Sequence, residues 1–148
     1  MARSIIGVIV GYVAMFILNF AVFVGLYAIV GPNNAFKPHR YLASNRWILM
    51  VVVATFITAI IAGLICAAIA KGGKAPLALA ILIIVMGWLL AVPAIMKARA
   101  NAEMIRMGDV PAMEAAQKAY WPIWTPFALP VMQGIGAVIG GKLRRRRS

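Results

Sequence analysis

The chain has 148 residues, of which 64% are hydrophobic and 12% are charged, and its formal net charge is +12. A soluble domain is about 45–50% apolar and about 25% charged, so this composition excludes an ordinary soluble fold and predicts an all-α integral membrane protein. The three acidic residues lie between positions 103 and 114, whereas the 15 basic residues lie between or beyond the apolar runs. This pattern favours anionic lipid headgroups as partners and predicts no nucleic-acid binding, which requires a soluble basic face.

The first apolar run, from Ile5 to Val30, predicts the first membrane span. As a helix it would be about 39 Å long against a hydrocarbon core of about 30 Å, so we expect it to tilt or protrude. It is too long for the core of a signal peptide and is interpreted as an uncleaved anchor. Turn-forming residues at 31–34 end this run, and the next apolar run predicts a second span over residues 48–70.

A third span is predicted over residues 76–96, directly after the short basic turn at 71–74. Spans two and three should therefore form an antiparallel helical hairpin. Pro76 suits the first turn of a helix, where its missing N–H group has no partner in any case. Pro93 lies near the end of the span and is expected to bend it.

A short helix over residues 109–120 is predicted at the level of the lipid headgroups. Asp109 is expected to cap its N-terminus, with Pro111 in the first turn. Glu114 and Lys118 are four residues apart and share one face of this helix, where opposite charges attract.

The last apolar region, over residues 123–141, predicts a fourth span that is rich in proline. Pro122, Pro126 and Pro130 recur every four residues, and Gln133 interrupts the rest of the region. A kinked full span is favoured, while the alternative is a re-entrant segment that the other helices shield from lipid. With four spans, residues 1–148 form a single transmembrane domain with the architecture of a four-helix bundle.

Small residues spaced by four recur in all four spans and predict close helix packing, because small side chains let helix backbones approach in a membrane. The residues of these stripes are Gly7, Gly11, Ala59, Gly63, Ala67, Gly87, Ala91, Gly136 and Gly140. The sequence leaves open whether they join helices within one chain or between chains.

Polar side chains are few within the spans, and they are Tyr12, Asn19, Thr55, Thr58 and Gln133. Asn19 lies near the middle of the first span, where an amide is costly unless it forms a hydrogen bond, so it should face other helices. These residues either form a polar site inside the bundle or simply staple neighbouring helices together. We favour the staple.

No catalytic residues, metal ligands or cofactor site are predicted. His39 is the sole histidine and lies in a loop, and Cys66 is the sole cysteine and lies in an apolar run, so the spacings that hold zinc or haem do not occur. The predicted spans also contain no Asp, Glu, Lys, Arg or His, the residues that ion-coupled transporters place within the membrane. The protein is therefore expected not to be an enzyme.

The basic residues Lys142, Arg144, Arg145, Arg146 and Arg147 follow the last apolar region and are predicted to bind lipid headgroups. Together with Arg3 they predict that both termini are cytoplasmic, in a bacterial inner membrane. Two functions from different classes then remain. The favoured one is an accessory or scaffold subunit that binds other membrane subunits, or itself as a homo-oligomer, and the alternative is an oligomeric channel or carrier for neutral or anionic solutes.

Overall fold

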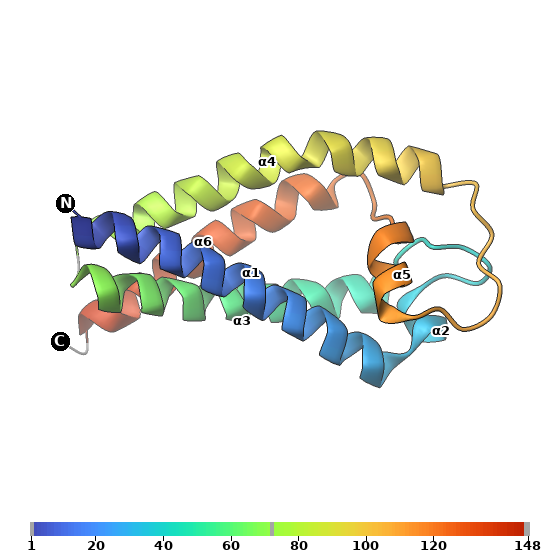
Figure 1. Ribbon diagram of the computed structural model, residues 1–148, viewed down its shortest axis with the longest axis horizontal. Coiled ribbons are helices and arrows are strands. Elements are labelled where there is room, and N and C mark those ends of the chain that lie inside the picture. The colour runs from blue at the N-terminus through green and yellow to red at the C-terminus, as the bar shows by residue number, and fades with distance from the viewer. Residues whose placement is uncertain (1, 72, 147–148) are drawn as a thin grey trace.

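The computed structural model describes residues 2–71 and 73–146. Helices dominate this part of the chain, and they are α1 (Ala2–Val30), α2 (Pro32–Ala35), α3 (Asn45–Ala70), α4 (Ala75–Asn101), α5 (Ala112–Lys118) and α6 (Thr125–Arg146) (Figure 1). Within residues 2–71 and 73–146, β-type pairing consists of isolated bridges in the connecting loops. The prediction of an all-helical protein is confirmed.

Three of the described helices, α1, α3 and α4, are long and apolar enough to cross a membrane. The chain is therefore a membrane-embedded helical protein, as its composition predicts. α6 is not among the three, although it is continuous over 22 residues. Its apolar character is diluted by Pro126, Pro130 and Gln133 and by the basic residues of its last turn.

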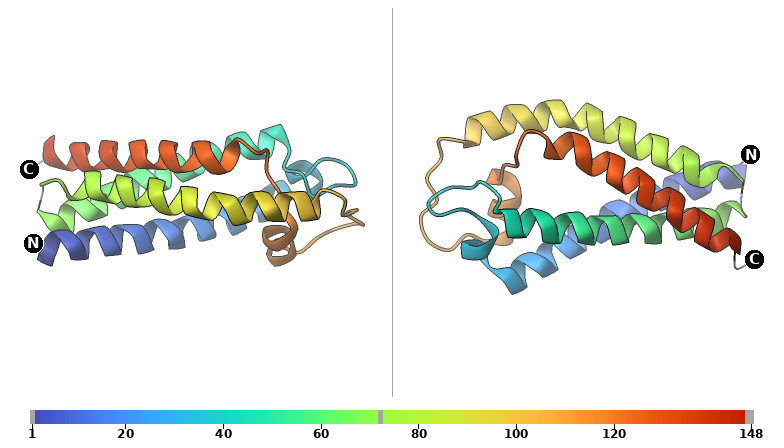
Figure 2. Two further views of the ribbon diagram at one scale, coloured as in Figure 1. Left: turned by 90° about the horizontal axis from the view of Figure 1, so that it is seen from above. Right: turned by 180° about the vertical axis from the view of Figure 1, so that it is seen from behind.

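The four long helices form an elongated bundle in which α3 and α6 lie side by side and run in the same direction (Figures 1 and 2). α1 packs on α3, and α4 packs on α6, each running opposite to its neighbour. Both ends of the chain and the turn between α3 and α4 consequently lie at one end of the bundle, here called the basic end. The loops at residues 31–44 and 102–124, with α2 and α5, form the other end, here called the cap.

Local signals explain where the bundle helices begin and end. The Ser44 hydroxyl caps α3 by accepting a hydrogen bond from the Trp47 N–H at 3.2 Å. α3 ends at Lys71, which adopts the left-handed conformation with φ 52°. Pro76 lies in the first turn of α4, where the sequence predicts it, and α4 continues past Met96 to Asn101.

The cap has a hydrophobic core of its own, which the sequence analysis did not predict. Tyr27, Phe36, Tyr41 and Trp47 form a buried aromatic cluster whose ring centroids lie about 6 Å apart along the chain of contacts. The Tyr27 hydroxyl donates a hydrogen bond to the Val110 carbonyl at 2.7 Å and so links α1 to the distant loop. The loops at residues 31–44 and 102–124 thus pack against each other as one unit.

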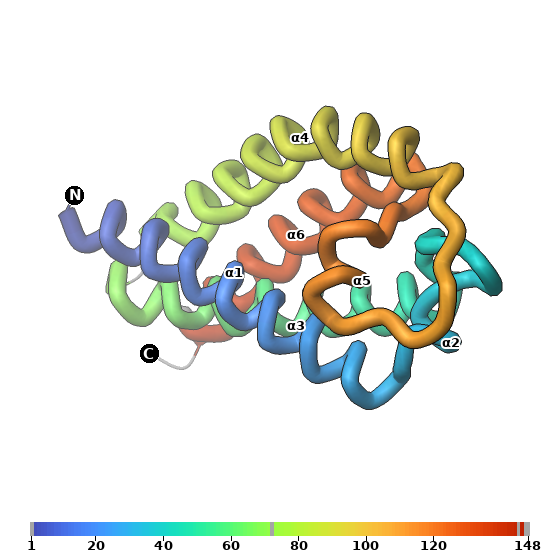
Figure 3. Tube along the Cα trace, turned by 45° about the vertical axis from the view of Figure 1, so that its right-hand side comes forward, coloured from blue at the N-terminus to red at the C-terminus, as the bar shows by residue number. Residues whose placement is uncertain are grey.

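The helix predicted over residues 109–120 is shorter in the structure, because α5 contains only Ala112–Lys118. Pro111 is its N-cap, and Asp109 does not cap it, so that part of the prediction is wrong. The backbone of Pro111 is extended, with ψ 152°, and this prevents the helix from starting earlier. α5 lies across the space between the cap ends of α1 and α4, as Figure 3 shows.

Candidate functional site

The predicted small residues of α3 and α6 lie where these two helices touch. A Cβ atom added to Gly63 would overlap the carbonyl of Ala137, and one added to Gly140 would overlap the carbonyl of Ile60. At Gly136 the added atom would lie 3.0 Å from the Phe56 carbonyl oxygen. Ala59 and Ala67 are buried on the face of α3 that packs in the bundle. The backbones of α3 and α6 approach as closely as glycine allows.

The remaining predicted small residues join α1 and α4 to the same pair of helices. An added Cβ at Gly7 would lie 2.9 Å from the Cys66 carbonyl oxygen, and one at Gly11 would lie 3.0 Å from the Cys66 Cβ. On α4, Gly87 lies against the ring of Pro130, and Ala91 is buried. The structure thus places these stripes between helices of one chain.

Two further glycines of α6 make contacts of the same kind, and the sequence analysis did not select them. Gly134 faces Ile84 and Gly141 faces Pro76, both on α4. In the sequence, Gly134 and Gly141 belong to the same glycine-rich stretch as Gly136 and Gly140, and this was the signal available for them. Gly25 of α1 is different, since nothing lies within 4 Å of an added Cβ there.

Two of the five intramembrane polar residues meet across α1 and α3. The Thr58 hydroxyl donates to Asn19 Oδ1 at 2.5 Å and also lies 2.9 Å from the Thr55 carbonyl oxygen. Thr55 donates its own hydroxyl to the Val52 carbonyl within α3. Tyr12 and Gln133 are half-buried, and neither side chain forms a hydrogen bond with another described residue. The five side chains thus form one interhelical pair and no larger polar cluster among the described residues.

The isolated reactive residues lie apart from one another. His39 is exposed in the cap loop and adopts a left-handed backbone with φ 58°. Cys66 is fully buried on α3 beside Gly11. Across residues 2–71 and 73–146, no group of three His, Cys, Asp or Glu side chains is placed to hold a metal ion.

Polar contacts fasten α5 to both of its neighbours in the cap. The Lys118 ammonium lies 2.6 Å from Glu114 Oε1, as the shared helix face predicts, and the Tyr41 hydroxyl donates to the same oxygen at 3.2 Å. The hydrogen bond from Lys118 lowers the pKa of Glu114 below its ordinary value of 4.5, and the bond from Tyr41 adds to this effect. On α4, the Asn101 amide donates to the Lys118 carbonyl at 3.0 Å. α5 therefore bridges the loop at 36–44 and the end of α4.

Arg106 is a second fastening point in the cap, and its side chain is only 8% exposed. Its guanidinium donates to the Asn33 side chain and to the Gly108 carbonyl, both at 3.1 Å. These bonds tie the loop at 102–111 to α2. The signal in the sequence is weak, because an arginine in a polar loop is usually exposed.

Charge is distributed unequally between the two ends of the bundle. The basic end gathers cationic residues from three separate segments, and they are Arg3, Lys71, Lys74, Lys142, Arg144, Arg145 and Arg146. Arg147 and the side chain of Arg145 lie outside the described residues. All three acidic residues, Glu103, Asp109 and Glu114, belong to the cap, where they partly offset its four basic residues, Lys37, Arg40, Arg106 and Lys118. The basic end has no acidic residue among those described.

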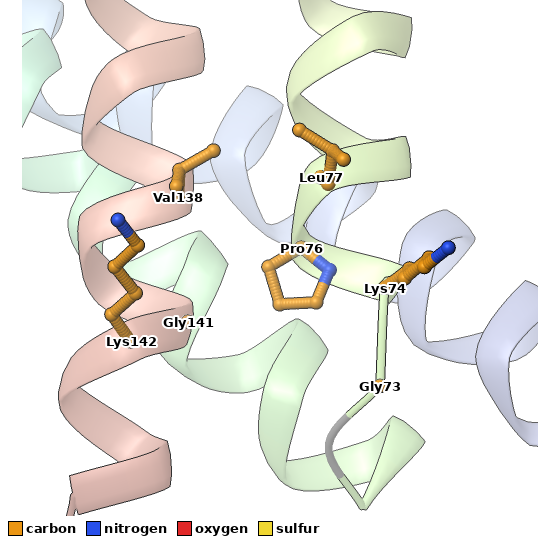
Figure 4. Close-up of a pocket in the computed structure, with 7 residues that line it drawn as sticks. All are labelled: Gly73, Lys74, Pro76, Leu77, Val138, Gly141 and Lys142. Atoms are coloured by element: carbon orange, nitrogen blue, oxygen red, sulfur yellow. The ribbon is translucent and has the colours of Figure 1, made fainter.

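A groove of about 320 Å³ opens between α4 and α6 at the basic end (Figure 4). Its floor is apolar and is formed by Pro76, Leu77 and Val138, with the Pro76 ring pressed against Gly141. Figure 4 shows Lys142 extending along α6 beside Val138 and Lys74 extending outward from the start of α4. In this view the Lys74 side chain points away from α6, so its ammonium group lies on the far side of α4 from the groove.

Comparison with known protein families, with curated proteins and with solved structures finds no match for this chain. The class of the protein therefore rests on the fold and the site. They define a helical membrane protein with a tightly packed bundle, a folded cap and a strongly basic opposite end.

Proposed function

We propose that this chain is a small non-catalytic subunit or scaffold of a membrane complex, held by anionic lipids at its basic end. The observation that carries the proposal is the unequal charge of the two ends, because a purely cationic end matches a negatively charged leaflet. In this proposal α6 is a fourth span, the basic end faces the cytoplasm and the membrane is a bacterial inner membrane.

A partner protein would contact the outer helix faces in this proposal. The small residues that favour close contact are occupied between α1, α3, α4 and α6, so they do not remain for a partner. The outer face of α1 is apolar and exposed, with Phe16 69% and Phe20 51% exposed, and a Cβ added at the nearby Gly25 would meet no atom within 4 Å. The partner is accordingly another membrane subunit or a second copy of this chain.

The channel or carrier alternative has less support. A solute path needs a continuous polar surface, but Asn19 is already paired with Thr58 and the Thr55 hydroxyl bonds to its own helix. The alternative stays a prediction that flux measurements test.

The proposal is tested by purifying the chain from its native membrane in two mild detergents. We expect one membrane protein, or a second copy of the chain, to be retained at a fixed ratio in both. In parallel, the pure chain is reconstituted alone into liposomes and assayed for anion, water and neutral-solute flux. Saturable flux that Asn19→Leu abolishes, with the fold intact, would contradict the scaffold function and support the channel.

A further inference from the structure

We propose that α5 is a hinged lid on the cap, which lies closed against α1 and α4 while Glu114 is ionised and swings away from α1 when that carboxylate is protonated. The inference goes beyond the proposed function, because it gives the folded cap a part that moves separately and a signal that moves it.

The segment that would move is residues 111–119, because the residue on each side of it is held by hydrogen bonds to other elements. The carbonyl of the buried Val110 accepts the Tyr27 hydroxyl of α1 at 2.7 Å. The N–H of Tyr120 donates to the Tyr41 carbonyl at 3.1 Å, and the carbonyl of Tyr120 accepts a second backbone N–H of the same loop at 3.1 Å. Both ends of the segment are therefore fixed.

Between these fixed ends, α5 has flexible joints and few apolar contacts of its own. Pro111 and Ala119 flank the helix with extended backbones, at ψ 152° and 136°. Of the seven residues of α5, all of them described, only Ala115 is buried, and Met113 is 60% exposed. The burial of one methyl group contributes little, so polar contacts decide whether the helix stays in place.

Hollows beside α5 show that it is not packed tightly on the bundle. One of about 320 Å³ lies between α5 and the α1 residues Phe20, Phe23 and Val24. A second, of about 200 Å³, lies between the end of α5, the start of α6 and Ala94 and Ala98 of α4. Protein interiors contain few voids of this size, so α5 can move without breaking a close-packed contact. Figure 3 shows it crossing between the cap ends of α1 and α4.

On the α4 side, two side chains hold the last turn of α5 by its carbonyl groups. The Asn101 amide donates to the Lys118 carbonyl at 3.0 Å, and the Lys97 ammonium donates to the Ala116 carbonyl at 3.4 Å. Carbonyls in the last turn of a helix lack partners within the helix, so these donors are well matched to them. Neither contact titrates in acid, and we expect this end of α5 to stay attached.

Glu114 is the part of the attachment that acid can release. Its Oε1 accepts the Tyr41 hydroxyl at 3.2 Å and lies 2.6 Å from the Lys118 ammonium. The other groups near it are Tyr27 of α1, which feels its charge, and Lys97 of α4, which bonds two residues further along α5. Lysine and tyrosine side chains keep their charge state in acid, whereas protonation of Glu114 weakens both of its bonds.

The sign of the pH dependence follows from these bonds. The hydrogen bond from Lys118 and the bond from Tyr41 lower the pKa of Glu114 below its ordinary value of 4.5. The attachment is therefore complete above pH 4.5 and is lost as the pH falls through the lowered pKa. Opening on this side enlarges the hollow beside Phe20 and Phe23.

The test measures the distance between two spin labels by double electron–electron resonance, with the full Cys66→Ser chain in phosphatidylcholine nanodiscs. One label replaces Met113 on α5 and the other replaces Ile81 on α4, which is 55% exposed and far from the cap. Between pH 7 and pH 3 the distance distribution should shift or broaden by about 5 Å, the radius of a helix with its side chains. Glu114→Gln should show the shifted distribution already at pH 7.

Two controls separate a lid from loosening of the whole cap. A label at Met107, paired with Ile81, reports on the cap outside the moving segment and should keep its distance at both pH values. Asp109→Asn removes a carboxylate from the cap outside α5 and should leave the acid change at Met113 in place. Equal changes at Met107 and Met113 would overturn the lid. So would a distance at Met113 that acid and Glu114→Gln both leave unchanged.

Discussion

Glycine positions differ sharply in what a single methyl group would meet. Gly63 and Gly140 face backbone carbonyls of the neighbouring helix, and backbone has no rotamer with which to move aside. We predict that Gly63→Ala and Gly140→Ala each lower stability by about 1–3 kcal/mol, the usual cost of overpacking. Thermal unfolding in a mild detergent measures this loss.

Gly25→Ala is the matched control for these variants, because an added methyl at Gly25 meets no atom within 4 Å. Alanine favours a helix over glycine by about 0.5–1 kcal/mol, so the stability should stay unchanged or rise. Equal destabilisation by all three variants would show that the packing of α3 on α6 is not as described.

The pairing of Asn19 with Thr58 predicts a measurable coupling between α1 and α3. Asn19→Leu, Thr58→Val and the double variant form a cycle in which the coupling should be about 0.6 kcal/mol and at most about 1.7 kcal/mol, the range for hydrogen bonds between membrane helices. Thr55→Val should show no coupling to Asn19, because the Thr55 hydroxyl bonds within its own helix. A coupling of zero for Asn19 and Thr58 would show that their hydrogen bond does not hold α1 to α3.

Composition and spacing indicate which small and polar residues lie at helix contacts, but they do not indicate which residues these contact. The spacing of Gly136 and Gly140 indicates a contact face in any helix, whereas the partner carbonyls of Phe56 and Ile60 depend on the angle at which two helices meet. The same holds for Asn19: an amide in an apolar run must find a partner, but the sequence offers Thr55, Thr58 and Gln133 equally.

Among the elements, α5 gives a prediction that depends on pH. The pKa of Glu114 is lowered in the folded chain, so its ionised form stabilises the cap fully above pH 4.5, and this stabilisation is lost as the pH falls through the lowered pKa. The hydrogen-exchange protection of α5, taken relative to the intrinsic amide exchange rate at each pH, should therefore fall on acidification below pH 4.5. In Glu114→Gln the exchange should be fast already at neutral pH and should lose this dependence. Unchanged exchange in the variant would show that the Glu114 bonds do not hold α5.

Three prolines spaced by four residues occupy three different kinds of position before and within α6. Pro122 precedes the helix, Pro126 lies in its first turn, where no N–H partner is lost, and Pro130 lies inside it against Gly87. The pattern of one proline every four residues weakens the prediction of a helix from sequence. Only the contact with Gly87 shows why a proline is accommodated at position 130.

At the scale of the whole molecule, the membrane class follows from hydrophobic content, because about 20 consecutive apolar residues are what a membrane-spanning helix needs. The folded cap does not follow in the same way. Its core combines Tyr27 from the end of α1 with Phe36, Tyr41 and Val110 from two connections that look polar in sequence. Aromatic residues inside a charged loop were the available signal, and only the three-dimensional arrangement shows that they meet.

We propose that the chain crosses the membrane four times, with the basic end in the cytoplasm and the cap outside. The most direct test places single cysteines at Met107, 86% exposed in the cap, and at Leu143 near the end of α6, in a Cys66→Ser background. A membrane-impermeant maleimide added to intact cells should label the cysteine at position 107 at once and the cysteine at position 143 only after permeabilisation. Labelling at position 143 in intact cells would contradict the account.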